Sequence, residues 1–157
     1  GFLRDRFGFE RMPDFRPKLW EKIRKEADGA RRDVPEKLLF GSDRDAEAVR
    51  FARSNCANLP GGDRIRIRPS DFRNLEPIEG ATILTNPPYG LRMGQEAQMS
   101  GLYKSLGDFF KQKCTGCTAY VYFGNREWSK HLGLRTSWKK PLVNSQLDGR
   151  LVKYELY

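Results

Sequence analysis

The sequence predicts an α/β fold built as one domain. Helix and strand patterns alternate along all 157 residues, and no internal repeat or low-complexity segment interrupts them. A chain of this length buries a single core. A hydrophobic fraction of 38% beside a charged fraction of 31% favours a globular domain in water over a membrane span or a disordered chain. No apolar run approaches the roughly 20 residues of a membrane-spanning helix, and no secretory signal pattern opens the chain. We therefore expect a cytoplasmic protein with no membrane partner.

A helix and then a strand are expected first. Pro17 suits the first turn of a helix and Gly29 its end, and the apolar residues between them fall on one helical face. These features predict a helix over residues 17–28. The apolar run 38–40 then predicts a short strand, which ends at the Gly-Ser-Asp sequence of residues 41–43.

A second helix follows this strand directly. Its apolar or small residues repeat at helical spacing, namely Val49, Ala52, Cys56 and Leu59. Ser42 with Asp45 three residues later resembles a capping box, in which both side chains serve the first turn of a helix. The carboxyl end of the strand is therefore expected to lie at a helix start.

Two further strands precede the third helix. Ile65 and Ile67 alternate with arginines, which predicts a second strand. The run 81–85 predicts a third strand, which must stop at Pro87 and Pro88 because proline has no N–H to donate to a ladder. The residues that then line one helical face are Leu102, Leu106, Phe109 and Phe110.

The last part of the chain predicts a buried strand and a hairpin. The nearly unbroken apolar run 119–123 is typical of a buried parallel strand. A short helical stretch follows over 125–132. Two extended segments then flank Asp148 and Gly149, and the second of them alternates apolar and polar residues over 152–156. We expect a C-terminal antiparallel hairpin.

The charge balance favours a polyanionic partner. The chain has 29 Lys and Arg against 20 Asp and Glu, a formal net charge of +9. Counterion release and long-range attraction favour nucleic acid as the partner of so basic a domain. Arginines also cluster near the N-terminus and alternate through Arg64, Arg66 and Arg68, which adds modest support for this interpretation.

The cysteines predict neither a disulfide framework nor a metal site. Cys56, Cys114 and Cys117 are an odd number of thiols in a chain without a signal pattern. Cys114 and Cys117 have the spacing of half a zinc site, but a second ligand pair is missing and His131 is the one histidine. We interpret both cysteines as small residues before a buried strand, and His131 and Trp128 as structural.

The chemistry of the chain is expected at Asn86-Pro87-Pro88-Tyr89, directly after a strand, where open α/β sheets place their ligands. An exocyclic aromatic amine is a poor nucleophile, because its lone pair is delocalised into the ring. The Asn86 amide oxygen and a Pro-Pro carbonyl can accept its two N–H bonds and aim the lone pair at an electrophile. Tyr89 could stack on the base, a contact worth about 1–3 kcal/mol. The alternative is a rigid turn leaving the sheet.

These four residues resemble the signature of S-adenosylmethionine-dependent amino-group methyltransferases, which modify adenine, guanine or glutamine amide nitrogens. Over nearly its whole length the chain is similar to the catalytic domain of the 23S rRNA guanine-N2 methyltransferases, the THUMP-associated RNA methylase family. The segments that carry the resemblance are Phe7–Arg11, Gly41–Asp43, Asn86–Gly90 with Arg92, and Leu132–Arg135.

The resemblance implies a Rossmann-like class I methyltransferase sheet and S-adenosylmethionine as cofactor. Asp43, with Ser42 beside it, would bind the ribose hydroxyls of the cofactor, and Asp71 its adenine amino group. Phe72 would pack against the adenine, and Asn86–Tyr89 would hold the target base. Carboxylates at strand ends suit the first two roles. Helix capping by Asp43 and a plain loop carboxylate at Asp71 remain open at this point.

The chain departs from the family pattern in two places. Leu91 stands where the family usually has an acidic residue after the Tyr-Gly pair. The first strand and the Gly-rich turn near the methionine part of the cofactor are also missing from the sequence. In the family that strand lies between the strands ending at Asp43 and Asn86, so its absence would leave two edges unpaired. We therefore expect residues 1–157 to be the later part of a catalytic domain in a longer protein with an upstream THUMP-type RNA-binding region.

The function predicted from these features is methylation of an exocyclic base amine, most specifically guanine N2 of 23S rRNA. An adenine-N6 methyltransferase acting on DNA or RNA is the alternative enzyme, because the same four residues serve that amine. Methylation of a glutamine amide in a protein suits the charge less well. A nucleic-acid-binding fragment that is inactive on its own is the alternative from a different class.

Overall fold

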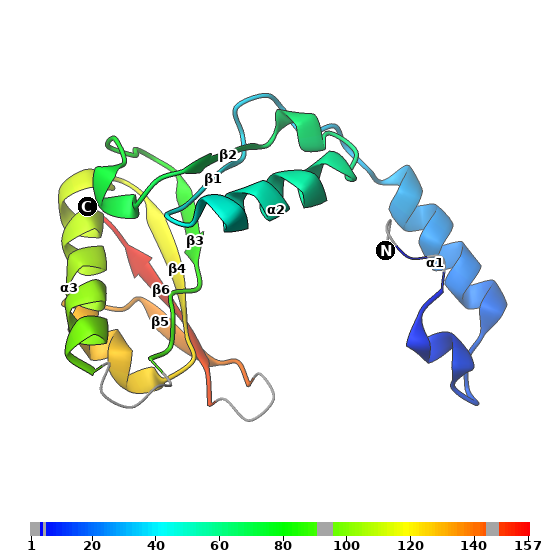
Figure 1. Ribbon diagram of the computed structural model, residues 1–157. Coiled ribbons are helices and arrows are strands. Elements are labelled where there is room, and N and C mark those ends of the chain that lie inside the picture. Colours follow the sequence, from blue (N-terminus) through cyan, green and yellow to red (C-terminus); the bar gives the residue numbers. More distant parts are fainter. Residues whose placement is uncertain (1–3, 5, 91–95, 144–147) are drawn as a thin grey trace. The chain divides into compact units, whose positions relative to one another are not determined.

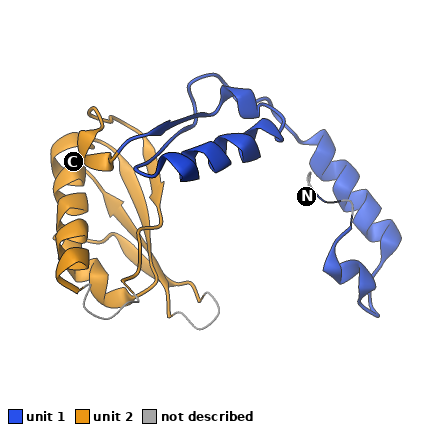
Figure 2. Ribbon diagram, viewed as in Figure 1, with its two compact units in different colours: residues 1–70 blue, residues 71–157 orange. Residues whose placement is uncertain are grey.

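The computed structural model describes residues 4, 6–90, 96–143 and 148–157 and has an α/β fold (Figure 1). The chain divides into two compact units, residues 1–70 and residues 71–157 (Figure 2). The described strands form one two-stranded sheet and one four-stranded sheet. The strands of the first sheet belong to the first unit and those of the second sheet to the second unit.

The first unit holds two α-helices and a pair of parallel strands. Its elements in chain order are η1 (Gly8–Arg11), α1 (Pro17–Gly29), β1 (Phe40–Asp43), α2 (Ala46–Ala57), η2 (Gly62–Arg64) and β2 (Arg66–Pro69). β1 runs parallel to β2 with Gly41 opposite Ile67. Arg53 of α2 donates from Nε to the Ile67 carbonyl over 2.8 Å, which fastens the helix to the strand pair.

The strand before α2 differs from the expected one in both its bounds and its cap. Gly41–Asp43 belongs to the strand instead of ending it, because the backbone of β2 pairs with these residues whatever their side chains. Asp45, and not Ser42, is the N-cap of α2: its carboxylate accepts from the amides of Glu47 and Ala48. The capping box predicted at Ser42 is therefore wrong.

The second unit holds the longest helix and a four-stranded sheet (Figure 1). Its elements are η3 (Phe72–Asn74), β3 (Thr82–Thr85), α3 (Glu96–Lys113), β4 (Thr118–Phe123), η4 (Arg126–Leu132), β5 (Trp138–Pro141) and β6 (Arg150–Glu155). The strand order is β3-β4-β6-β5, with β3 and β4 parallel and the other two pairs antiparallel. The C-terminal antiparallel hairpin is confirmed, and the helical stretch over 125–132 is a 3-10 helix.

The core of the second unit lies between α3 and the sheet. Tyr103 and Phe110 of α3, Phe123 of β4, Leu132 of η4 and Val152 of β6 are at most 1% exposed. The close approach of α3 to η4 depends on Gly107, where a Cβ atom would stand 1.9 Å from the Leu132 carbonyl oxygen. β3 packs against this core through Ile83.

Among the described strands, β1 pairs with β2 alone and β3 with β4 alone. Both are therefore edge strands, and they carry Asp43 and the segment before Asn86. In the part of the chain that the structure describes, no helix has the length and apolar character needed to cross a membrane.

Candidate active site

The Asn86–Tyr89 segment leaves the carboxyl end of β3, where Thr85 lies opposite Val121 of β4. The Asn86 side chain is exposed, Pro87 is buried and Tyr89 is half-buried. The two prolines end the ladder because neither has an N–H to donate. The sequence prediction that a short strand stops here is confirmed.

Two carbonyl groups of this segment accept hydrogen bonds from aromatic side chains. Tyr103 Oη donates to the Pro88 carbonyl over 3.0 Å, and Trp128 Nε1 donates to the Tyr89 carbonyl over 3.0 Å. The rings of Tyr103 and Trp128 are stacked, with centroids 5.6 Å apart and planes 6° apart. Sequence reasoning missed Tyr103 and gave Trp128 no link to the site.

The environment of Tyr103 keeps its hydroxyl protonated. Burial raises the pKa of this phenol well above its ordinary value of 10.0, and the neighbouring Tyr89 raises it further. Removing water disfavours the phenolate, which is the charged form. Tyr103 therefore acts as a hydrogen-bond donor to Pro88 throughout the pH range in which proteins are usually studied.

The ring of Tyr89 rests against the carboxyl end of β4. It meets Tyr122 edge to face, with centroids 5.9 Å apart and planes 72° apart. Gly124 makes room for the ring, because a Cβ atom at that position would stand 2.5 Å from Tyr89 Cγ. Gly90 directly follows the segment, and its φ of +67° is in the left-handed region that favours glycine.

The first unit holds two of the predicted cofactor residues, Ser42 and Asp43. Both side chains are exposed at the carboxyl end of β1. Asp43 Oδ1 accepts from the Asp45 amide over 2.9 Å, so this carboxylate shapes the turn that leads into α2. The Asp43 carbonyl accepts from the Ser70 amide over 2.8 Å, which continues the pairing of β1 with the chain after β2.

The second unit holds the other two, Asp71 and Phe72. The Asp71 carboxylate accepts two hydrogen bonds from the Arg73 guanidinium, over 2.9 Å from Nε and 2.6 Å from Nη2. The hydrogen bond and the charge of Asp71 together raise the pKa of Arg73. Phe72 meets Phe109 of α3 at 5.6 Å with the ring planes 66° apart. Arg73 is a second residue that the sequence reasoning missed.

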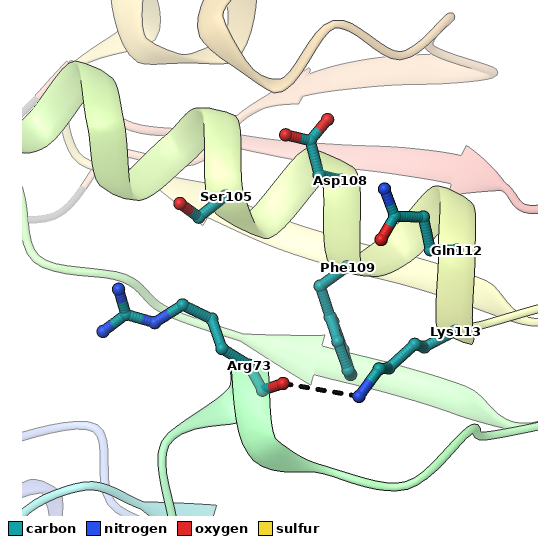
Figure 3. A pocket seen from close by; sticks show the side chains of 6 residues that line it. All are labelled: Arg73, Ser105, Asp108, Phe109, Gln112 and Lys113. Atoms are coloured by element: carbon teal, nitrogen blue, oxygen red, sulfur yellow. Dashed lines mark hydrogen bonds between the residues drawn. The ribbon is translucent and has the colours of Figure 1, made fainter.

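A shallow hollow of about 300 Å³ lies between η3 and α3 (Figure 3). Arg73 of η3 and five α3 residues line it, namely Ser105, Asp108, Phe109, Gln112 and Lys113. Lys113 Nζ reaches across to the Arg73 carbonyl at 3.4 Å (Figure 3). It also donates to the Leu75 carbonyl at 2.8 Å. These bonds fasten the end of α3 to the loop after η3, and none of the residues that line the hollow belongs to the Asn86–Tyr89 segment.

The cysteine pair lies in the core. Cys114 and Cys117 are at most 1% exposed, and Cys117 Sγ lies 3.3 Å from the Ile78 carbonyl. Burial, with a smaller effect of Cys117, raises the pKa of Cys114 to about 11. Among the described residues, no group of three or more His, Cys, Asp or Glu side chains could hold a metal ion. The exposed His131 contacts Ser100 Oγ through Nδ1 at 2.9 Å.

The strand order and the residues at the strand ends identify the class of fold. β1 and β3 each run parallel to a neighbouring strand and end in a polar residue, α3 packs on the second sheet, and β6 lies antiparallel between β4 and β5. These features are typical of a Rossmann-like fold. Two solved structures share it. A chain described as a methylase from Clostridium difficile 630 has a TM-score of 0.80 and 27% identity, covering 99% of this chain and 41% of that one. A chain described as a methyltransferase complexed with SAH has a TM-score of 0.79 and 24% identity, covering 100% and 41%.

The particular family follows from the sequence comparison. The model of the family described as "RMKL-like, methyltransferase domain" matches residues 1–153, and the chain belongs to this family. A Synechocystis protein named as an RNA methyltransferase is 40% identical over 96% of this chain. The ribosomal RNA large subunit methyltransferase K/L of Marinobacter nauticus is 34% identical over 99% of it. The chain spans 40% and 22% of the lengths of these two curated relatives.

Proposed function

We propose that this chain carries part of the catalytic domain of an enzyme that methylates an exocyclic amine of an RNA base, with S-adenosylmethionine as the methyl donor. The most specific form of the proposal is guanine N2 of 23S rRNA. One observation carries it: the Asn86–Tyr89 segment lies at the carboxyl end of a parallel strand. The carbonyls of Pro88 and Tyr89 accept hydrogen bonds, and the Asn86 side chain is exposed. Membership of the RMKL-like methyltransferase family supports the same reaction.

The amine needs one acceptor oxygen for each of its two N–H bonds. We assign the amine to the Pro87 carbonyl, which directly follows Asn86, and leave the Pro88 carbonyl to its bond from Tyr103. The Asn86 amide oxygen is the other. With both N–H bonds directed at these oxygens, the nitrogen lone pair points away from the ring plane.

Asn86 and Pro87 would hold the amine while its lone pair forms the new C–N bond and the electrons of the C–S bond remain on sulfur. The methylated nitrogen would then release one proton to water. S-adenosylmethionine, when bound, supplies an activated methyl group on a sulfonium, so the chain itself needs to supply orientation and no acid or base.

The target base has to leave its stack to reach Asn86. Tyr89 offers a half-buried aromatic ring three residues after Asn86, and stacking is worth about 1–3 kcal/mol per base. The formal net charge of +9 favours attraction of an RNA backbone, which carries one negative charge per nucleotide. Both features support a nucleic acid substrate. We also propose that the protein acts in the cytoplasm.

The carboxylates suit the cofactor chemically. Asp43 is exposed at a strand end and can accept from ribose hydroxyls with oxygen lone pairs that remain after its bond to Asp45. Asp71 is paired with Arg73, and an adenine amino group would share the Asp71 carboxylate with that guanidinium. Ser42 and Phe72 would complete these contacts. We propose that the longer protein supplies the first strand, the Gly-rich turn and the THUMP-type region.

A transfer assay with the full-length protein tests this proposal. Labelled S-adenosylmethionine is offered with unmodified 23S rRNA, DNA and a release-factor protein side by side, and the product is digested and identified by mass spectrometry. We expect N2-methylguanosine from rRNA and none with Asn86→Ala. N6-methyladenosine would instead support the alternative base, and methylated protein the glutamine alternative. Salt-sensitive RNA binding without transfer to any substrate would overturn the enzymatic proposal.

A further inference from the structure

The Asn86–Tyr89 segment cannot be held in place by the hydrogen bonds of a β-ladder. Those bonds need backbone N–H groups, and Pro87 and Pro88 have none. Reorientation of an amine demands that the accepting oxygens stay fixed, since misplacement by about 1 Å can cost 10²-fold in rate. The segment must therefore be held through its carbonyl groups and its side chains.

Tyr103 and Trp128 provide this hold from two different elements. Their donors bind two consecutive carbonyls, those of Pro88 and Tyr89, each over 3.0 Å. The two rings stack on each other, and Tyr103 also stacks on Phe123 of β4 with centroids 5.5 Å apart. Tyr103 is fully buried and Trp128 is 9% exposed. A donor group held in such a stack has little freedom to move together with the Asn86–Tyr89 segment.

We propose that Tyr103 and Trp128 are positioning residues for methyl transfer: they fix the backbone after Asn86 so that the Asn86 and Pro87 oxygens meet the amine in one geometry. This inference rests on the proposed function. Neither residue needs to touch the substrate. The effect should fall on turnover and leave binding of S-adenosylmethionine unchanged, because the anchored carbonyls belong to the proposed base site and not to Asp43 or Asp71.

The chain offers a matched control for the phenol of Tyr103. Tyr154 of β6 is also 0% exposed in the same unit, yet its hydroxyl has no hydrogen-bond partner among the described residues. Tyr103→Phe and Tyr154→Phe therefore remove the same atom from equally buried rings. Only the first removes a bond to the Asn86–Tyr89 segment.

The experiment compares both variants and Trp128→Phe with the wild-type full-length protein in the transfer assay. We expect Tyr103→Phe and Trp128→Phe to lower kcat about tenfold or more with the KM for S-adenosylmethionine within about twofold of wild type. Tyr154→Phe should keep the wild-type kcat. The double variant should lose less than the product of the two single losses, because both donors hold one segment.

Hydrogen–deuterium exchange of peptides covering residues 86–90 gives a readout that does not depend on activity. We expect faster exchange in Tyr103→Phe and unchanged exchange in Tyr154→Phe. Equal kcat values and equal exchange in these two variants, with an active wild-type enzyme, would overturn this inference alone. A wild-type enzyme that transfers no methyl group would overturn the proposed function, whereas faster exchange in Tyr103→Phe would still support the anchoring.

Discussion

Gly124 lies directly against the ring of Tyr89, so close that a Cβ atom at Gly124 would stand 2.5 Å from Cγ and 2.6 Å from Cδ1 of that ring. Gly124 follows β4 and Tyr89 follows β3, and these two strands are parallel neighbours. Their carboxyl ends therefore share one edge of the sheet, where the missing side chain at Gly124 sets the position of the aromatic ring.

Gly124→Ala should displace the Tyr89 ring and lower the rate of methyl transfer about tenfold or more, because the ring has to move to clear the new methyl group. The strain should also cost about 1–3 kcal/mol of unfolding free energy. The matched control is Gly101→Ala on α3, where a Cβ atom would meet nothing within 4 Å. That variant should be stabilised by up to about 1 kcal/mol. Urea unfolding and transfer kinetics on both variants check this pair, and full activity of Gly124→Ala would contradict the expectation.

Asp43→Ala and Asn86→Ala should separate cofactor binding from base orientation. We expect Asp43→Ala to abolish the calorimetric signal for S-adenosylmethionine, because the ribose hydroxyls lose a charged acceptor. Asn86→Ala should bind S-adenosylmethionine like the wild type and lose at least about 10²-fold in kcat.

The control for Asp43 is Asp63→Ala, which removes an exposed carboxylate of η2, and the control for Asn86 is Asn58→Ala at the end of α2. Both controls should bind the cofactor and turn over normally. If Asp43→Ala binds as tightly as Asp63→Ala, the role of Asp43 is limited to the turn before α2.

Tyr154→Phe should not destabilise the protein. The hydroxyl is buried with no partner among the described residues, and an unpaired polar group costs about 1–3 kcal/mol of desolvation. Its removal should leave the unfolding free energy unchanged or raise it by up to about 1 kcal/mol, whereas Tyr103→Phe should lower it by about 1 kcal/mol. Chemical denaturation, with the m-value fitted for each variant, measures these unfolding free energies. A large loss in Tyr154→Phe would show that this hydroxyl has a partner after all.

The raised pKa of Tyr103 predicts the pH dependence of stability. The phenol ionises less readily in the folded chain than in the unfolded one, whose pKa is near the ordinary 10.0. Its contribution to stability is therefore fully present below about pH 10 and is lost as the pH rises through the folded pKa. Between pH 6 and pH 9 the unfolding free energies of wild type and Tyr103→Phe should differ by a constant amount. A difference that changes within this window would contradict the assigned pKa direction.

The thiols should react in the order of their burial. Cys56 is half-buried, whereas Cys114 is 0% exposed and has its pKa raised to about 11. Iodoacetamide at pH 8 should label Cys56 first and Cys114 only on unfolding, because the thiolate is the reactive form. Mass spectrometry of timed digests follows each site, and fast labelling of native Cys114 would contradict this order.

Periodicity and turn chemistry predicted most elements of the fold, because the pattern of apolar residues is set by which face is buried. The segment 119–123 and the hairpin around Gly149 are examples. One feature depended on tertiary pairing instead. Gly41–Asp43 became part of β1 because β2 pairs with it, and no side-chain pattern records that.

The candidate site was predicted in part. Asn86–Tyr89 could be singled out because two prolines after an apolar run are a local signal. The structure confirms that the strand ends there, and the catalytic role of the segment remains a prediction. The roles given to Asp43, Asp71 and their neighbours remain predictions. Tyr103 could not be found, because its position on α3 follows the helical spacing of a core residue and its partner lies 15 residues earlier. The bond between Arg73 and Asp71 joins residues two apart, and no sequence pattern that we used indicated it.

The prolines of the site also protect an exposed sheet edge. Ala81–Thr85 carries no charge, β3 pairs with β4 alone among the described strands, and Leu84 is 76% exposed. Such a segment is a template on which a second chain could add a strand. Pro87 and Pro88 limit how far that pairing can extend. In the longer protein the first strand that we propose would cover this edge. In the isolated chain, a variant that replaces either proline would lose a barrier to self-association, and its binding of S-adenosylmethionine is informative only when measured on monomeric protein.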